Sequence, residues 1–260
     1  MRHHRVFPVL LALAVLIACG DDGSQAEPPT TVATDGLTGT VTVLAAASLT
    51  DAFGDIEAAF EASHEGVDVE LTFDGSATLA TAIIEGAPGD LFASADQANL
   101  DKVADEGLLA GVPSTFATNV LQIVVPAGNP LAIDSLEDLT APDVTLSLCG
   151  EQVPCGRYAT QAFEKAGLEV PPAGDQENVK GVLTQVQLGE ADAGIVYLTD
   201  VLAADDVEGI DLAPDEQVEA KYPASVLADA SNPEGAAALL TFLTGVEAQA
   251  ILERFGFGLP

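Results

Sequence analysis

Residues 41–60 read VTVLAAASLTDAFGDIEAAF, and this stretch decides the fold class. The segment VTVL that opens it is an apolar, β-branched run typical of a buried strand. A predicted amphipathic helix follows, and its apolar residues share one face of a 3.6-residue period: Leu49, Phe53, Ile56 and Phe60. Ser48 stands at the turn between strand and helix. We predict that Ser48 is the N-cap and that its hydroxyl and the free N–H groups of the first turn form an anion site, a simple N-cap without a ligand being the alternative.

A second segment repeats this arrangement. Residues 67–73 alternate between apolar and polar side chains as a half-buried strand does, and Ser76 precedes a helix predicted over 77–84. Gly86 and Pro88 would end that helix. Two serines at successive strand-to-helix turns suggest one shared anion. Two successive βα units also predict an α/β fold with a parallel sheet, whose ligands bind at the carboxyl ends of the strands.

The N-terminal part of the chain predicts export. Basic residues followed by an apolar run indicate a signal peptide over 1–18, and the run is too short to span a bilayer. The segment LIAC that ends at Cys19 resembles a bacterial lipobox, so we predict that Cys19 becomes the lipidated first residue. A plain secretory signal is the alternative. Residues 19–40, rich in Asp, Pro, Thr and Gly, are expected to form a lipidated N-terminus and flexible tether.

The cysteine count supports the same compartment. With Cys19 used for lipid, only Cys149 and Cys155 remain, and a close pair in an exported chain predicts a disulfide. Two free thiols or a metal pair are the alternatives. A tetrahedral metal site is disfavoured because no neighbouring Cys or His completes the ligand set.

The chain is strongly acidic, with 41 acidic residues, eight basic ones and a formal net charge of −33. This charge disfavours nucleic acids and anionic membrane surfaces as partners. The acidic residues are spread along the whole chain, and no Asp-x-Asp-x-Asp-Gly loop occurs among them. This pattern indicates a solvated surface rather than a calcium site.

Six segments resemble, in the same order, the extracytoplasmic molybdate-binding proteins of ABC importers. The matching segments are AAASLT at 45–50, SATLA at 76–80, GAPGDLFASAD at 86–96, VPCG at 153–156, GIVY at 194–197 and RFGF at 254–257. The resemblance implies a two-lobed fold of the type II periplasmic-binding-protein kind, with the ligand in the cleft between the lobes. Lobe I would comprise residues 41–118 plus 221–260, and lobe II residues 119–220. Such proteins close on their ligand by a hinge motion.

The resemblance also implies a set of oxyanion contacts. Ser48 and Ser76 would donate from lobe I through their hydroxyls. From lobe II, Cys155 and Val179 would donate through backbone N–H groups, and Tyr197 through its hydroxyl. The two serines follow from the residues themselves as well, whereas the other three contacts rest on the resemblance alone.

The implied function is capture of molybdate or tungstate and delivery to an ABC permease in the membrane, without cofactor or bond chemistry. We expect an extracytoplasmic monomer anchored to the cell membrane as a lipoprotein. An anion-sensing lipoprotein for a signalling partner, or a binding protein for another tetrahedral oxyanion such as sulfate, would share the site. A serine hydrolase is disfavoured because a nucleophilic serine needs an adjacent base, and His64, the one histidine of the mature chain, lies in a polar segment beyond the first helix.

Three charged residues near the predicted contacts carry separate expectations. Asp74 lies two residues before Ser76, where a carboxylate facing the ligand would repel it, so we expect Asp74 to point into solvent. Arg157 and Lys180 lie within two residues of predicted contacts. We expect their charges to attract anions to the mouth of the cleft and raise the association rate.

Overall fold

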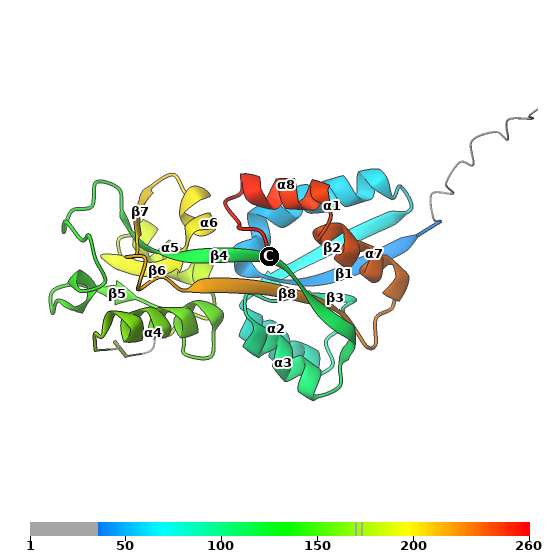
Figure 1. Cartoon of the computed structure of the whole chain (residues 1–260), viewed down its shortest axis with the longest axis horizontal. Helices are drawn as coiled ribbons and strands as arrows, with labels where there is room; N and C mark the ends of the chain where they lie inside the picture. The colour runs from blue at the N-terminus through cyan, green and yellow to red at the C-terminus, as the bar shows by residue number, and fades with distance from the viewer. Residues whose placement is uncertain (1–35, 170, 173) are drawn as a thin grey trace, which may run out of the picture. The chain divides into compact units, whose positions relative to one another are not determined.

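The computed structural model describes residues 36–169, 171–172 and 174–260 (Figure 1). This described part of the chain forms one compact unit. The predicted signal peptide over 1–18, the predicted lipidation site Cys19 and most of the predicted tether lie outside it.

The first half of the fold consists of successive βα units, as the sequence predicts. Its elements are β1 (Gly39–Ala46), the 3₁₀ turn η1 (Ala47–Leu49), α1 (Thr50–Ser63), β2 (Val67–Asp74), α2 (Ser76–Ile84), β3 (Leu91–Ala93) and α3 (Gln97–Asp105). Strand β1 pairs in parallel with β2 on one side and with β3 on the other. The ends of β1 and β2 therefore bring the turns at Ser48 and Ser76 to the same edge of the sheet.

Two long antiparallel strands, β4 (Leu109–Pro126) and β8 (Glu219–Leu227), run side by side between the two halves of the fold (Figure 1). Strand β4 pairs with β8 as far as Val120 and with β6 and β7 from Leu121 onward. All strands thus form one mixed sheet in the order β2-β1-β3-β8-β4-β6-β5, with β7 beside β4. We use the names lobe I and lobe II for the predicted bounds given above, which remain a prediction.

The second half is also α/β. Its elements are η2 (Asp138–Thr140), β5 (Leu146–Ser147), α4 (Pro154–Ala166), α5 (Val179–Gln187), β6 (Ala193–Tyr197), α6 (Leu198–Leu202) and β7 (Val207–Asp211). After β8, the chain returns to the first half with α7 (Pro233–Leu243) and α8 (Val246–Arg254). The predicted α/β class is confirmed.

The apolar face of α1 is buried as its period predicts. The Phe53 ring lies 5.9 Å from that of Phe116 on β4, and the Phe60 ring 5.5 Å from that of Phe242 on α7. Burial of one such side chain contributes about 1.5–3 kcal/mol, so these contacts hold α1 firmly against the sheet and α7. Within the described residues no single helix is long and apolar enough to cross a membrane; α7 and α8 reach that length and composition only together, across a bend of 61°.

Candidate functional site

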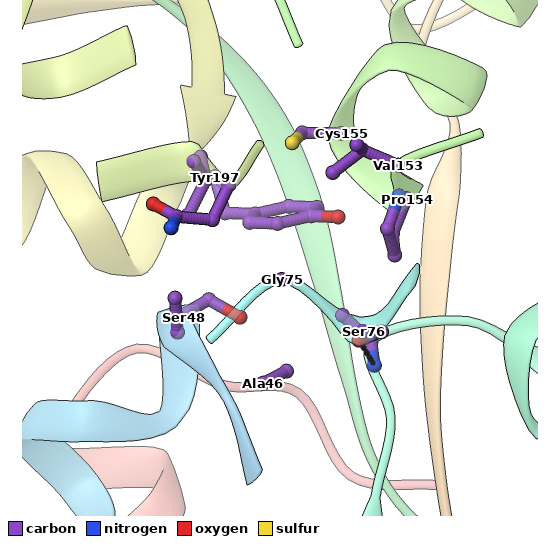
Figure 2. Close-up of a pocket in the computed structure, with 12 residues that line it drawn as sticks. Ala46, Ser48, Gly75, Ser76, Val153, Pro154, Cys155 and Tyr197 are labelled. Atoms are coloured by element: carbon purple, nitrogen blue, oxygen red, sulfur yellow. Dashed lines mark hydrogen bonds between the residues drawn. The ribbon is translucent and has the colours of Figure 1, made fainter. Parts of the chain in front are cut away.

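A small cavity lies between residues of lobe I and lobe II (Figure 2). All five predicted contacts are among the 12 residues that line it. Ser48 and Ser76 line it from lobe I, and Cys155, Val179 and Tyr197 from lobe II. The free volume is about 10 Å³, the room that about one water molecule needs, so the residues around the cavity lie close together.

Ser76 is the first residue of α2 and is 1% exposed. Its Oγ accepts a hydrogen bond of 2.9 Å from the backbone N–H of Ala95. A serine hydroxyl has one proton, and this bond does not use it. Ser76 can therefore donate that proton to a ligand in the cavity.

Ser48 is not an N-cap, so this part of the prediction is wrong. Helix α1 begins at Thr50, Leu49 occupies the cap position, and no side chain caps it. The 3₁₀ turn η1 separates β1 from α1 and places Ser48 before the cap. Its Oγ lies 2.9 Å from the Tyr222 hydroxyl, and Figure 2 shows the side chain beside the cavity.

Two helices of lobe II begin at the cavity. Pro154 is the first residue of α4 and has no N–H, so Cys155 supplies the first backbone donor of that helix. Val179 is the first residue of α5, whose N-cap Asn178 accepts from the Gly181 N–H at 3.1 Å. The first N–H groups of a helix have no acceptor within it and carry the positive end of its dipole. Both helix starts therefore suit an anion.

The start of α4 is held in place by a disulfide between Cys149 and Cys155. The neighbouring Gly156 packs closely against the same segment, because a Cβ there would lie 2.2 Å from the carbonyl oxygen of Gly150 and 2.6 Å from that of Cys149. The covalent bond and this backbone contact together fix the position of the Cys155 N–H.

Tyr197, the last residue of β6, contributes a buried hydroxyl. Its side chain is 1% exposed, and no described residue forms a hydrogen bond with that hydroxyl. Burial, reinforced by neighbouring Tyr222, raises the pKa of Tyr197 well above its ordinary value, so the hydroxyl keeps its proton. A buried hydroxyl without a partner costs about 1–3 kcal/mol, which a ligand that accepts its proton would recover.

The cavity offers hydrogen-bond donors and no charged side chain. None of the described residues that line it is Asp, Glu, Lys, Arg or His. The carboxamide of Asn178 is already used, since its Oδ1 accepts from Gly181 and its Nδ2 donates to Asp74. In the described part of the chain no group of His, Cys, Asp and Glu could hold a metal ion. Such a site suits an anion that accepts hydrogen bonds at every oxygen.

Asp74 does not point freely into solvent, contrary to the prediction. The residue is half-buried, and its Oδ1 accepts from the Gly75 N–H at 2.7 Å and from the Asn178 Nδ2 at 3.1 Å. Asp74 is not among the residues that line the cavity. Its carboxylate is instead one of the contacts between lobe I and lobe II.

Arg157 and Lys180 are also not free to attract anions in this arrangement. Arg157 forms an ion pair with Asp96 of lobe I. Lys180 Nζ lies 2.9 Å from Oδ2 of Asp51 in lobe I and 3.2 Å from Oδ1 of the buried Asp200 in lobe II. Burial lowers the pKa of Lys180, but the two carboxylates outweigh it and raise the pKa, so Lys180 stays charged. Both cations connect the lobes.

The chain matches the family of bacterial extracellular solute-binding proteins over residues 41–258. The molybdate-binding protein ModA of Mycobacterium tuberculosis strain H37Rv is 39% identical over 96% of this chain and 95% of its own length. Its counterpart in Escherichia coli strain K12 is 36% identical over 84% of this chain and 89% of its own length. Among solved structures, the periplasmic molybdate-binding protein of Azotobacter vinelandii shares the fold with a TM-score of 0.74 and 21% identity, over 85% of this chain and 99% of that chain.

Proposed function

Because the chain belongs to the bacterial extracellular solute-binding proteins, and to the group within them named ModA, we propose that it captures molybdate or the similar anion tungstate. The fold is that of the periplasmic binding proteins, of type II. The chain is an extracytoplasmic solute-binding protein of the ABC-transporter kind and not an enzyme.

One observation carries the proposal: hydroxyl groups and helix-start N–H groups line the cavity, and no charged side chain does. Molybdate is fully deprotonated at neutral pH and can only accept hydrogen bonds. The hydroxyls of Ser48, Ser76 and Tyr197 and the N–H groups of Cys155 and Val179 meet that requirement. The dipoles of α4 and α5 offset the charge of the anion where a buried cation would otherwise be needed.

The proposal extends to delivery and anchoring. A bound anion enclosed between two lobes is released when the lobes separate, which suits transfer to a membrane permease. Lipidation at Cys19 would keep the protein at the membrane that holds the permease. We propose that the protein acts as a monomer, since one chain supplies all the donors of the cavity.

The proposal predicts a defined loss of affinity when one donor is removed. Titration calorimetry of the mature wild-type protein should show one molybdate bound per chain, and Ser76→Ala should bind it roughly 5- to 150-fold more weakly, the equivalent of 1–3 kcal/mol. Thr78→Ala is the matched control, because Thr78 is an exposed hydroxyl residue on the same helix and does not line the cavity. Absence of molybdate and tungstate binding, or equal affinities for wild type and Ser76→Ala, would contradict the proposal.

The ion pairs between the lobes predict an effect on release of the anion. Asp51→Asn removes the lobe I partner of Lys180 and leaves the Lys180–Asp200 pair within lobe II. A partly exposed pair contributes about 0.2–1 kcal/mol, so release of molybdate should become up to about 5-fold faster in stopped-flow tyrosine fluorescence.

Asp55→Asn is the matched control for that prediction. Asp55 lies on the same helix and pairs with Arg254, which also belongs to lobe I. This variant should leave the release rate unchanged. If Asp51→Asn changes only the association rate, electrostatic attraction by Lys180, and not a connection between the lobes, is the role of this cation.

A further inference from the structure

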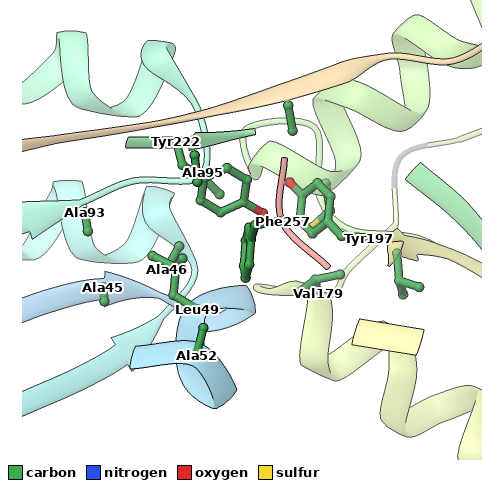
Figure 3. Close-up of a cluster of buried hydrophobic side chains, with 14 of the residues drawn as sticks. Ala45, Ala46, Leu49, Ala52, Ala93, Ala95, Val179, Tyr197, Tyr222 and Phe257 are labelled. Atoms are coloured by element: carbon green, nitrogen blue, oxygen red, sulfur yellow. The ribbon is translucent and has the colours of Figure 1, made fainter. Parts of the chain in front are cut away.

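A line of buried hydrogen bonds connects Ser48 to β8 and β4. Asn119 on β4 donates through Nδ2 to the Tyr222 hydroxyl on β8 at 3.4 Å, and that hydroxyl lies 2.9 Å from Ser48 Oγ. Asn119 is 2% exposed, Tyr222 0% and Ser48 4%. Neither Asn119 nor Tyr222 lines the cavity. Figure 3 shows the Tyr222 ring within the apolar cluster near Tyr197 and Leu49.

The orientation of the Asn119 side chain is fixed by its own backbone neighbour. Its Oδ1 accepts from the Val120 N–H at 2.9 Å. The amide nitrogen therefore faces the other way, where it donates to Thr199 Oγ1 at 2.9 Å and to the Tyr222 hydroxyl. An amide nitrogen can only donate, so the Tyr222 oxygen must accept.

The direction of the Asn119–Tyr222 hydrogen bond affects the next one, between Tyr222 and Ser48. Because Tyr222 accepts from Asn119, its own proton is available for Ser48 Oγ. Burial raises the pKa of Tyr222, which therefore keeps the proton that it donates. When Tyr222 donates, Ser48 Oγ accepts, and the single proton of Ser48 is left for the cavity. The Ala95 N–H leaves the Ser76 proton free in the same way.

We propose that Asn119 and Tyr222 are positioning residues that hold the Ser48 hydroxyl as a donor toward the bound oxyanion. This inference rests on the proposed function of the cavity. If Ser48 donated to Tyr222 instead, a lone pair of its oxygen would face the negative ligand, and one attraction would become a repulsion. Donation by Asn119 to the Tyr222 oxygen favours this direction before the ligand arrives and so reduces the reorientation of the hydroxyl that binding requires.

A double-mutant cycle tests this role by calorimetry. Tyr222→Phe should lower the affinity for molybdate about 3- to 10-fold in the wild-type background. In the Ser48→Ala background the same change should have no effect, because no hydroxyl is left to orient. In the Ser76→Ala background it should keep its full effect. Equal losses in all three backgrounds, or no loss in the wild type, would overturn the proposal, since a general disturbance of packing does not depend on Ser48.

A second variant keeps the test independent of one substitution. Asn119→Ser should weaken molybdate binding about 2- to 5-fold, and again only where Ser48 is present. Thermal unfolding of the unliganded variants separates a loss of folded protein from a loss of affinity. If Tyr222→Phe does not fold, the Asn119 cycle decides the proposal by the same criterion.

The test also separates this inference from the proposed function. If the wild type binds sulfate and not molybdate, the proposed function is wrong, and the cycle measured with sulfate still supports or overturns the positioning role. If the wild type binds no tetrahedral oxyanion, both proposals are overturned.

Discussion

Replacing Gly75 by alanine should lower the affinity for molybdate roughly 30-fold to 10⁴-fold while each lobe stays folded. A Cβ at Gly75, in lobe I, would lie 2.0 Å from the carbonyl oxygen of Glu177 in lobe II. No real Cβ approaches a backbone oxygen so closely, and this oxygen is not at the end of a flexible side chain. The lobes would have to remain further apart.

The backbone at Gly75 does not itself require glycine. Its φ of −59° and ψ of 135° are ordinary for alanine, so lobe I alone tolerates the change. The loss comes from lobe II donors that no longer reach the anion. If two of the donors from Cys155, Val179 and Tyr197 are lost at about 1–3 kcal/mol each, the affinity falls by the factor given above.

Gly54→Ala is the matched control for this prediction. Gly54 lies on the exposed side of α1, and nothing would lie within 4 Å of its Cβ. This variant should bind molybdate as the wild type does and be up to about 1 kcal/mol more stable, because alanine favours a helix. Calorimetry gives the affinities, and small-angle X-ray scattering with and without molybdate shows whether Gly75→Ala still closes. If Gly75→Ala binds molybdate with the affinity of the wild type, the lobes do not need the close contact between Gly75 and Glu177 to hold the anion.

The sequence predicts the elements of the first half well because their patterns are local. The apolar face of α1 and the alternation in β2 are patterns of residues that are neighbours in the sequence. The apolar face of α1 is buried as predicted, and buried and exposed side chains alternate at the start of β2. The sequence pattern does not predict residues 109–119 of β4 as a strand. This segment contains Gly111 and Pro113, which interrupt the pattern, and its pairing with β8 shifts register at two places. Contacts that are distant in the sequence stabilise it, namely the pairing with β8 and the packing of Phe116 against Phe53.

The candidate site also contains some residues that local sequence patterns predict and others that they do not. Ser48 and Ser76 follow from local turns, whereas Cys155, Val179 and Tyr197 were predicted from resemblance alone. A local signal exists for two of these, since Pro154 and Asn178 are typical of helix starts. No local signal exists for Tyr222, because its partner Ser48 is 174 residues away.

Molybdate and tungstate should bind far more tightly than phosphate. Phosphate carries at least one proton at neutral pH, and the cavity lining contains no carboxylate to accept it. That proton and the protein donor that it faces would both lack an acceptor, at about 1–3 kcal/mol each. The expected discrimination is roughly 30-fold to 10⁴-fold. Competition calorimetry at pH 7 measures it.

Sulfate should be rejected for a different reason. It carries no proton, so only the size of the cavity can exclude it. Its shorter bonds leave some donors too far from its oxygens, whereas molybdate and tungstate are close in size and should compete almost equally. Sulfate binding as tight as molybdate binding would contradict the proposed selectivity.

The pH dependence distinguishes exclusion by the phosphate proton from simple exclusion by size. The Ser48 and Ser76 hydroxyls do not titrate, and the raised pKa of Tyr197 keeps its hydroxyl a donor, so molybdate affinity should be constant between about pH 6.5 and 8.5. Phosphate loses one proton in this range and still keeps another, so it should remain excluded at the upper end. A phosphate affinity that approaches that of sulfate at about pH 8.5 would show that the donor-only lining does not cause the discrimination.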